Sequence, residues 1–584
     1  MKSNFNKYPV VQVRKTEEEC LVGWVAITRQ LNQVFEDENS RKKILVVDCY
    51  QGTCEKEILK SLLLDIHPDK IFLSKSCMLP EQEIHDLTQT DVTEDRIFGY
   101  MTRLNLDQFF DQDKIDEVKT RIANIQEGII LLFGIGASLL TDEPHVLVYV
   151  DMARWEIQLR MRRDEVNNLG ITNFTDTFER QYKRGYFVDW RVLDRHKKKL
   201  MGRWDFVLDT NTCNEPKMLS GSLVREGLTQ AAHQPFSPVP YFDEGPWGGQ
   251  WMKEVCDLDP DKKNYAWCFN CVPEENSLYL GFGNIKFELP SVNVVFYEPV
   301  ALLGDPVHGR FGDEFPIRFD FLDTMGGGNL SLQVHPITEY IQEKFGLHYT
   351  QDESYYMLDA KEDTIVYLGL KEGIDGEQMM AELIKSETTG EQFPDEQYIE
   401  KWPAKKHDHF LIPAGTVHCS GRNGMVLEIS STPYIFTFKL WDWGRLGLDG
   451  NPRPINIEHG KNVIQWNRTT QWIKDNLINQ VKLLGSGEGW ECQQTGLHER
   501  EFIETHRHWF TEPVFHHNSS SVQVFNVIQG REIIVESTTG LFEPMVFHYA
   551  ETFIVPAAAG SIMISPCGES TGKKCGTIAA YVRT

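Results

Sequence analysis

Residues 1 to about 230 alternate apolar runs with amphipathic stretches. The runs at 42–50 (KKILVVDCY) and 128–136 (GIILLFGIG) are nearly continuous in apolar residues, as buried parallel strands require. The intervening stretches 58–64 and 113–125 have helical periodicity. This rhythm predicts an α/β domain over residues 1–230. The other strands predicted by the same criterion are 69–76, 145–152 and 204–211.

The pattern changes after residue 240. Short strands separated by Gly, Pro, Asn and Asp replace the long runs, and helical periodicity is confined to 371–405 and 455–485. Such a pattern is typical of an all-β barrel or sandwich with helical insertions. A second series of short strands covers 489–584, and the polar, then proline-rich stretch 214–240 is interpreted as a linker. We see no repeat of 20–50 residues, which argues against a solenoid.

The composition excludes several classes of protein. The 584 residues include 59 Lys and Arg against 85 Asp and Glu, a formal charge of −26. This charge disfavours nucleic-acid and membrane partners and requires any anionic ligand to meet local positive charge. The longest nearly apolar run, 128–140, is shorter than the roughly 20 residues of a membrane span, and residues 1–20 lack the apolar core of a signal peptide. Twelve scattered cysteines favour a reducing, cytoplasmic location.

One group of residues has the chemistry of a metal site. Gln333 and His335, in LSLQVHP, lie two apart on a predicted strand and therefore project from one face. The next predicted strand, in QDESYYMLDA, carries Glu353, and His418 ends the turn PAGTVH. An amide oxygen, two imidazoles and a carboxylate suit a divalent cation such as Zn, Mn, Fe or Co, and all could converge inside a small barrel.

Either histidine alone is more simply explained as a structural residue. The two histidines occur, however, in the motifs Gln-x-His and Pro-x-Gly-x-x-His. These motifs stand in the order expected of one barrel, and an acidic residue lies between them. This combination favours the metal site.

These motifs resemble class I mannose-6-phosphate isomerase, a cupin metalloenzyme. The resemblance covers roughly 238–584, about 60% of the chain, with the motifs in the family's order. It rests on PYFDEGPWGGQWMKE, FPIRFDFLDT, LSLQVHP, DESYYMLDAKEDTIVYLG, FLIPAGTVHCSGRNGMVLEIS, TFKLWDWGR, VFNVIQGREIIVES and ETFIVPAAAG.

The resemblance implies two mainly-β cupin (jelly-roll) domains with helical insertions. They are a catalytic metal-binding domain over 238–450 and a metal-free domain over 489–584, joined by a helical connector at 451–488. The family's metal ligands fall on Gln333, His335, Glu353 and His418, with zinc the preferred ion. The implied reaction moves a proton between C1 and C2 of a sugar phosphate through an enediol, interconverting mannose 6-phosphate and fructose 6-phosphate.

Three further residues are candidates for catalysis or substrate binding. Glu428 lies where the family has a glutamate near its site, although a surface or hydrogen-bonding glutamate is an equal interpretation. Lys439 occupies a position where the family usually carries Arg, and this change is not conservative because Arg offers a planar fork and Lys a compact charge. Lys439 can still bind substrate or exchange a proton. Arg445 matches a later family Arg and is a candidate for substrate or structural charge.

The C-terminal domain is not expected to bind a second metal. Its histidines lack the Gln-x-His and Pro-x-Gly-x-x-His pairing, and the turn 556–560 carries no histidine. Cys268 and Cys271 have no second pair and are interpreted as ordinary thiols. The histidines concerned are His506, His508, His516, His517 and His548.

The N-terminal domain resembles a degenerate P-loop kinase of the uridine-kinase type. A strand, a turn at 51–57 and a helix follow one another, but of the phosphate-binding motif only Gly52 and Lys56 remain. The segments 148–165 and 178–199 resemble the lid of such kinases. The arginines of these segments could clamp phosphates. Alternatively, they belong to a solvated helical face with ion pairs between residues four positions apart, such as Glu156 and Arg160. The arginines are Arg154, Arg160, Arg162, Arg163, Arg180, Arg184, Arg191 and Arg195.

Three roles of this domain are distinguished: a structural or regulatory pseudokinase, a domain that binds nucleotide or sugar phosphate without transfer, and an active kinase. For the whole chain we predict a metal-dependent isomerase of carbohydrate metabolism. The alternatives are a bifunctional sugar kinase–isomerase and a sensor that binds sugar phosphate without turnover. The native metal, the exact sugar and the oligomeric state do not follow from the sequence.

Overall fold

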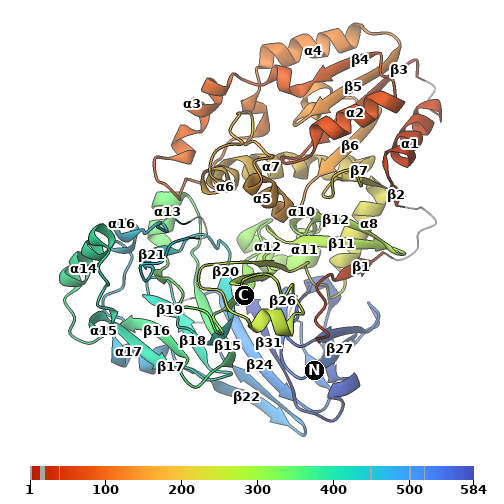
Figure 1. Ribbon diagram of the computed structural model, residues 1–584. Coiled ribbons are helices and arrows are strands. Elements are labelled where there is room, and N and C mark those ends of the chain that lie inside the picture. Colours follow the sequence, from red (N-terminus) through yellow and green to blue (C-terminus); the bar gives the residue numbers. More distant parts are fainter. Residues whose placement is uncertain are drawn as a thin grey trace. The chain divides into compact units, whose positions relative to one another are not determined.

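The computed structural model describes residues 3–13, 20–37, 40–447, 450, 452–496, 498, 501–518 and 520–584. The chain forms two compact units (Figure 1). The α/β unit contains Val10–Ala231 and Ser277–Tyr297, and the β unit contains Met1–Pro9, Ala232–Asn276 and Glu298–Thr584. The predicted domain boundary at 450/451 adjoins residues 448, 449 and 451, which lie outside the described residues.

The α/β unit is built on a seven-stranded sheet of order β2-β8-β7-β6-β3-β5-β4. The five strands β3 to β7 run parallel, and each lies in one of the five predicted apolar runs. Strand β6 is buried along its whole length, as expected of a strand covered on both faces. The strands are β2 Leu21–Val22, β3 Lys42–Cys49, β4 Lys70–Leu73, β5 Gly128–Gly134, β6 Val146–Asp151, β7 Phe206–Asp209 and β8 Lys217–Ser220.

Helices cover this sheet and bury its apolar core. Ile27 and Leu31 of the first helix and Ile58 and Leu62 of the second pack with strand residues such as Val148 in one core cluster. The α-helices are α1 Trp24–Asp37, α2 Glu55–Asp65, α3 Glu81–Val92, α4 Gln112–Asn124, α5 Arg154–Arg162, α6 Phe178–Arg184, α7 Trp190–Leu200 and α8 Gly221–Ala231. The shorter helices are η1 Ser74–Cys77, η2 Leu106–Phe109, η3 Ala137–Leu140, η4 Gly185–Asp189 and η5 Met201–Arg203.

Residues 277–297 belong to the α/β unit, whereas the sequence interpretation included them in the range 238–450. Long-range backbone pairing explains their position, because β11 pairs in parallel with β1 from the start of the chain. In addition, the Glu288 N–H donates to Asp209 Oδ2 (3.0 Å) at the end of β7. The elements of this part are β1 Val10–Gln12, β11 Ser277–Phe282, β12 Ile285–Pro290 and α10 Val292–Tyr297.

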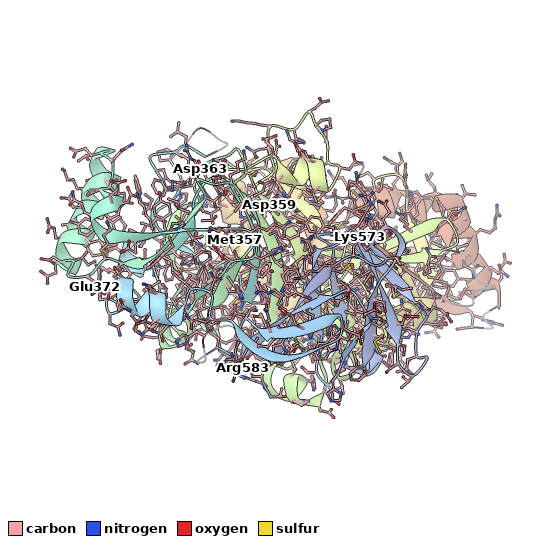
Figure 2. All side chains as sticks on the ribbon, turned by 90° about the horizontal axis from the view of Figure 1, so that it is seen from below. Met357, Asp359, Asp363, Glu372, Lys573 and Arg583 are labelled. Atoms are coloured by element: carbon pink, nitrogen blue, oxygen red, sulfur yellow. The ribbon has the colours of Figure 1, made fainter. Side chains whose placement is uncertain are left out.

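The β unit begins with a barrel of two antiparallel sheets, of order β18-β15-β20-β13-β10-β9 and β17-β16-β19-β14-β21. Strand β20 is buried throughout. Met357 of β15 lies in the packed interior, whereas the exposed Glu372 lies at the outer margin (Figure 2). The strands are β9 Tyr241–Asp243, β10 Trp267–Cys271, β13 Ile317–Asp323, β14 Leu332–Val334, β15 Glu353–Ala360, β16 Ile365–Leu370, β17 Ile399–Pro403, β18 His409–Ile412, β19 His418–Ser420, β20 Gly424–Ser431 and β21 Phe438–Trp441.

Helices are inserted between these strands or follow them, as the sequence pattern indicates for residues 371–405 and 455–485. They are α9 Trp251–Val255, α11 Pro299–Leu303, α12 Asp305–Phe311, α13 Thr338–Phe345, α14 Gly376–Thr389, α15 Asp395–Tyr398, α16 Ile457–Gly460 and α17 Thr470–Asn476.

A second two-sheet barrel completes the β unit, with orders β22-β23-β24-β31-β26-β29 and β25-β30-β27-β28. Phe525, Phe547 and Phe553 stack in its core. The strands are β22 Lys482–Gly487, β23 Trp490–Gln494, β24 Ile503–Phe510, β25 Val514–His516, β26 Gln523–Gln529, β27 Glu532–Ser537, β28 Met545–His548, β29 Thr552–Val555, β30 Ile562–Pro566 and β31 Cys575–Val582, with the short helices η6 Ala557–Ala559 and η7 Gly568–Ser570.

No helix in the part of the chain that the structure describes has both the length and the apolar character needed to cross a membrane.

A buried histidine makes the stability of the β unit dependent on pH. His409 is 1% exposed, and neither ring nitrogen has a hydrogen-bond partner among the described residues. Burial, together with the nearby Arg507 charge, lowers the pKa of His409 from 6.5 to about 3. Because the folded-state pKa is depressed, this contribution to stability is present above pH 6.5 and is lost as the pH falls toward 3. At pH 5 the loss is about 2 kcal/mol.

We therefore expect His409→Leu to reduce the difference in unfolding free energy between pH 7 and pH 5 by about 2 kcal/mol. Urea denaturation of the full chain at both pH values measures it. The matched control is the exposed His348→Leu, which should leave the difference unchanged. If the unfolding free energy of His409→Leu depended on pH as strongly as that of the wild type, the lowered pKa of His409 would be contradicted.

Candidate metal centre

The four predicted ligands come together inside the first barrel. Gln333 lies on β14 and directly opposes His418, the first residue of β19. His335 follows β14, and Glu353 is the first residue of β15. All four side chains are at most 7% exposed.

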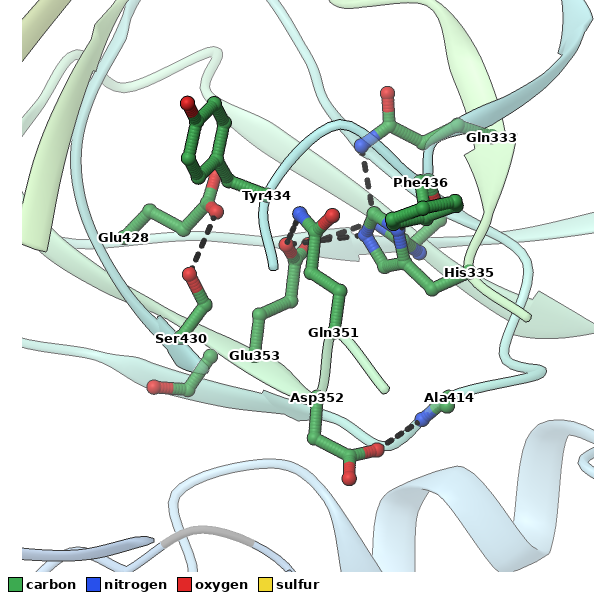
Figure 3. Close-up of polar contacts among 12 residues, drawn as sticks. Gln333, His335, Gln351, Asp352, Glu353, Ala414, Glu428, Ser430, Tyr434 and Phe436 are labelled. Carbon is green, nitrogen blue, oxygen red and sulfur yellow. Dashed lines mark hydrogen bonds and ion pairs between the residues drawn. The ribbon is translucent and has the colours of Figure 1, made fainter. Parts of the chain in front are cut away.

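The turn before His418 is tied to the strands that carry the other ligands. The Gly415 N–H donates to the carbonyl of His335 (2.9 Å), and the Ala414 N–H donates to Asp352 Oδ1 (2.7 Å) (Figure 3). Gly415 has φ +88°, and a Cβ there would lie 2.8 Å from the carbonyl oxygen of Val463. The glycine of the Pro-x-Gly-x-x-His motif is therefore needed for the turn that presents His418.

The Nε2 atoms of both histidines lie close to the carboxylate of Glu353. His335 Nε2 is 3.0 Å from Glu353 Oε2, and His418 Nε2 is 2.8 Å from Glu353 Oε1. Together the three residues form a group whose ligand atoms all lie within 4.8 Å. Donors bound to one Zn²⁺ at about 2.0–2.2 Å would show such separations.

Backbone carbonyls set the tautomer of both histidines. His335 Nδ1 lies 3.0 Å from the carbonyl of Phe436, and His418 Nδ1 lies 2.8 Å from that of Thr416. A carbonyl can only accept, so Nδ1 carries the proton in each ring. The Nε2 atom of each ring therefore faces Glu353, and this orientation is the usual one for metal-binding histidines.

This cluster leaves buried polar atoms unsatisfied. Two imidazole Nε2 atoms and a carboxylate meet in the protein interior, and despite the short distances neither His335 Nε2 nor Glu353 Oε1 makes a hydrogen bond to a described residue. Burial opposes ionisation of Glu353, but the two imidazoles hold the pKa of its carboxyl well below the usual range. The residues thus fit a divalent metal.

Gln333 completes the donor set when its side-chain amide is flipped. Its Nε2 lies 3.2 Å from His418 Nε2. Turning the amide by 180° about its last bond would present Oε1 instead, since the two ends of an amide are nearly identical in shape. Gln333 can therefore supply the amide oxygen that the sequence pattern predicts.

A cavity of about 170 Å³ adjoins the ligand cluster. Gln333 belongs to both, and Gln351, whose Nε2 donates to Glu353 Oε2 (3.4 Å), lines the cavity as well. A small polar molecule in this cavity would meet the metal ligands on one side and charged groups on the other. Those charged groups are Arg318, Asp320, Glu428, Lys439 and Arg453.

Lys439 is a cation that lines the cavity. Among the described residues, no carboxylate lies within ion-pair distance of its ammonium group. It lies on β21 directly opposite Gln333. Burial, and then the charge of Arg453, lowers the pKa of Lys439 from 10.5 to about 7. The ammonium can thus lose or gain a proton near neutral pH.

Glu428 is held by two neighbours on the cavity wall. The hydroxyl of Ser430 donates to Glu428 Oε1 (3.2 Å; Figure 3). The guanidinium of Arg318 contacts the same oxygen. Asp320 lies 3.5 Å from the same guanidinium, and burial raises the pKa of Asp320 to about 6. Glu428 is therefore a fixed, hydrogen-bonded carboxylate that also borders the cavity.

Arg445 and Arg453 share one carboxylate but differ in position. Arg445 contacts Asp442 and the carbonyl of Asn329, and it does not line the cavity. Arg453, which the sequence analysis did not single out, lines the cavity and donates to Asp442 Oδ2 (2.9 Å) and Ser331 Oγ (3.1 Å).

Arg318 and Asp320 were not among the residues predicted from the sequence. Both lie on β13 two positions apart, so the strand period of two would have placed their charges on one face of a mainly apolar strand. Arg453 follows β21 in an irregular segment and had no comparable signal.

The C-terminal histidines are dispersed around the second barrel. His508 and His516 are buried neighbours with ring centroids 4.2 Å apart, whereas His506 Nε2 contacts the Tyr581 hydroxyl (3.0 Å). Of the groups of three potential metal ligands found among the described residues, none includes a C-terminal histidine.

In the α/β unit, the turn that resembles a phosphate loop contacts a buried arginine and is followed by acidic residues. The Arg160 guanidinium donates to the Gly52 carbonyl (2.6 Å), and Glu55 and Glu57 lie in the first turn of α2. These carboxylates complement the helix dipole that a phosphate loop would offer to an anion.

The eight arginines predicted as a lid make contacts within the α/β unit. Arg162 lies over aromatic rings, and Arg191 and Arg195 donate to backbone carbonyls. The remaining arginines contact carboxylates: Arg154 with Asp194, Arg160 with Glu156, Arg163 with Glu156 and Glu165, Arg180 with Asp176, and Arg184 with Asp189.

Comparison with known proteins finds similarity in both parts of the chain. A family described as a domain of unknown function (DUF8485) matches residues 23–233. Mannose-6-phosphate isomerase ManA of Bacillus subtilis is 24% identical over 238 residues, which is 40% of this chain and 68% of that protein. Mannose-6-phosphate isomerase of Streptococcus mutans is 28% identical over 251 residues, covering 41% and 72%.

Solved structures of the same enzyme are similar over 60% of the chain. The mannose 6-phosphate isomerase of Bacillus subtilis aligns over its whole length, with 19% identity and a TM-score of 0.49. A zinc-bound mannose 6-phosphate isomerase also aligns over its whole length, with 13% identity and a TM-score of 0.45.

Proposed function

We propose that the β unit is a metal-dependent aldose–ketose isomerase that interconverts mannose 6-phosphate and fructose 6-phosphate through an enediol. The observation that supports this most strongly is the convergence of His335, Glu353 and His418, with both Nε2 atoms directed inward, beside a cavity that contains Lys439. The curated relatives carry the name of this activity, so the chemistry of the residues and the similarity point to the same reaction.

In this proposal Gln333, His335, Glu353 and His418 hold one divalent metal, preferably zinc. When bound, the metal supplies a positive charge that stabilises substrate oxygens as they become negative. The backbone carbonyls of Phe436 and Thr416 hold the two imidazoles in the required orientation.

The other cavity residues would bind the sugar and move its proton. With a pKa of about 7, Lys439 serves as a cation toward the developing oxyanion or the phosphate and also exchanges a proton. Glu428, fixed by Arg318 and Ser430, is placed to accept from a sugar hydroxyl or to take the migrating proton. Arg445 would act indirectly, by holding Asp442, which in turn orients Arg453.

For the α/β unit we propose the role of a structural or regulatory pseudokinase. Two observations support it: lid arginines such as Arg154 already pair with carboxylates, and the acidic first turn of α2 would repel an anion. An ATPase and sugar-kinase assay on the full chain tests it, and turnover of nucleotide that depends on Lys56 would instead support a kinase–isomerase.

Metal depletion and reconstitution test the isomerase. Chelator-treated protein, freed of chelator, should show no exchange of mannose 6-phosphate with fructose 6-phosphate by proton NMR, and one equivalent of Zn²⁺ or Mn²⁺ should restore it. Full activity in metal-free protein would overturn the proposal. Tight binding of sugar phosphate without product, in metal-loaded protein, would favour the sensor.

A further inference from the structure

Two thiols lie in contact at the carboxyl end of the α/β sheet, outside the metal centre. Cys54 follows β3 and precedes α2, while Cys213 follows β7. They are 159 positions apart in the sequence, yet their sulfur atoms are 3.3 Å apart. The fold therefore brings together two cysteines that no sequence motif links.

One buried arginine holds both loops. Arg160 Nη1 donates to the Gly52 carbonyl (2.6 Å), and Nη2 donates to the carbonyls of Thr210 and Asn211 (3.0 Å each). The same guanidinium contacts both sulfurs, at 3.2 Å from Cys54 Sγ and 3.7 Å from Cys213 Sγ. It thus fixes the distance between the thiols and places a positive charge beside them, which favours a thiolate.

The two thiols differ in exposure. Cys213 is exposed, and Cys54 is half-buried. Burial, and then the hydrogen bond with Cys213, raises the pKa of Cys54 to about 11, although Arg160 opposes this. Cys54 is thus held as a thiol, and Cys213 is the sulfur that a reagent in solvent reaches.

A metal ion at this position is less well supported. Glu57, the third potential ligand, already accepts from the Trp24 indole (2.9 Å) and from the Asn214 N–H (3.1 Å). The Arg160 charge would also repel a cation held by the two sulfurs. The observations therefore favour sulfur redox chemistry.

We infer that Cys54 and Cys213 form a reversible disulfide when the protein meets a peroxide. The Cys213 thiolate attacks one peroxide oxygen, so that an S–O bond forms, the O–O bond breaks and hydroxide leaves as water after protonation. The Cys54 sulfur then attacks the sulfenic sulfur, an S–S bond forms, and the S–O oxygen leaves as a second water with the Cys54 proton. Overall, two thiols are oxidised by two electrons and one hydrogen peroxide is reduced to two waters.

Peptide mapping of the full chain tests this inference, which does not depend on the isomerase activity. Fully reduced protein is treated with one equivalent of hydrogen peroxide, blocked with N-ethylmaleimide and digested without reductant. We expect a peptide that links Cys54 to Cys213, loss of two of the twelve thiols, and recovery of both with dithiothreitol. The melting temperature should rise on oxidation and return on reduction, because the bond constrains the unfolded chain.

Single variants separate the two steps. Cys54→Ser should stop at a sulfenic acid on Cys213 that dimedone traps, whereas Cys213→Ser should lose the linkage and the dimedone adduct at this site. The control, Cys567→Ser, removes another partly exposed thiol and should leave the linkage unchanged. Oxidation of Cys492 or Cys567 without a Cys54–Cys213 linkage would overturn the inference. So would stoichiometric zinc retained by the reduced protein and lost in both Cys54→Ser and Cys213→Ser, which would identify a metal site.

Discussion

Replacing His335 with alanine should abolish isomerisation of mannose 6-phosphate and remove the bound metal. His335 supplies one of the two imidazole nitrogens of a closed cluster, and its Nδ1 is already committed to the Phe436 carbonyl. Removing a residue that only hydrogen-bonds to a metal ligand typically lowers metal affinity or activity about 10–100-fold. Removing the ligand itself should therefore lower kcat by more than about 100-fold. Proton NMR of the exchange and elemental analysis of the metal measure the two effects.

A folded but inactive protein distinguishes this result from general damage. His335→Gln keeps an amide donor near the same place and should retain more metal than His335→Ala. The exposed His348→Ala is the matched control and should retain both activity and metal. Wild-type turnover in His335→Ala would contradict the assignment of the ligand cluster.

The second large effect is expected at Lys439. Lys439→Met removes a cavity cation that makes no ion pair with a described carboxylate, and we expect kcat to fall by about 100-fold or more, as when one group that stabilises an oxyanion is deleted. Because the pKa of Lys439 is about 7, the wild-type side chain is charged below pH 7 and neutral above it. If the charge assists the reaction, kcat/KM should decline as the pH rises through 7.

Lys439→Arg tests the sign of this dependence. A guanidinium stays charged throughout the accessible range, so the decline above pH 7 should disappear in this variant. The profile of kcat/KM between about pH 5.5 and 9 measures it, with the exposed Lys405→Met as a control that should match the wild type. A rise in kcat/KM through pH 7 in the wild type, lost in Lys439→Arg, would show instead that the neutral amine acts as a base.

Much of the fold follows from local patterns. Continuous apolar runs predicted the five parallel strands β3 to β7, and alternation with turn residues predicted the β unit. Of the predicted metal ligands, Gln333 on β14 and His335 just after it both reach the ligand cluster, and His418 follows a turn that needs Gly415. These features were readable because each depends on residues only a few positions apart.

Sequence reasoning was weaker wherever distant segments meet. The range 277–297 lies in the α/β unit because β11 pairs with β1, and no local periodicity records that pairing. The lid arginines have a recognisable pattern, but only their contacts with carboxylates, rings and carbonyls show how their charge is used.

By itself, then, the sequence determined the strand pattern, the order of the ligand motifs and the −26 charge that any anionic substrate must overcome. The tertiary structure alone decided that Arg318 and Arg453 border the cavity with Lys439, that Arg445 does not, and that Cys54 meets Cys213. The physical reason is one of range. Hydrophobic periodicity acts over a few residues, whereas these contacts depend on strand register and packing between segments up to 159 positions apart.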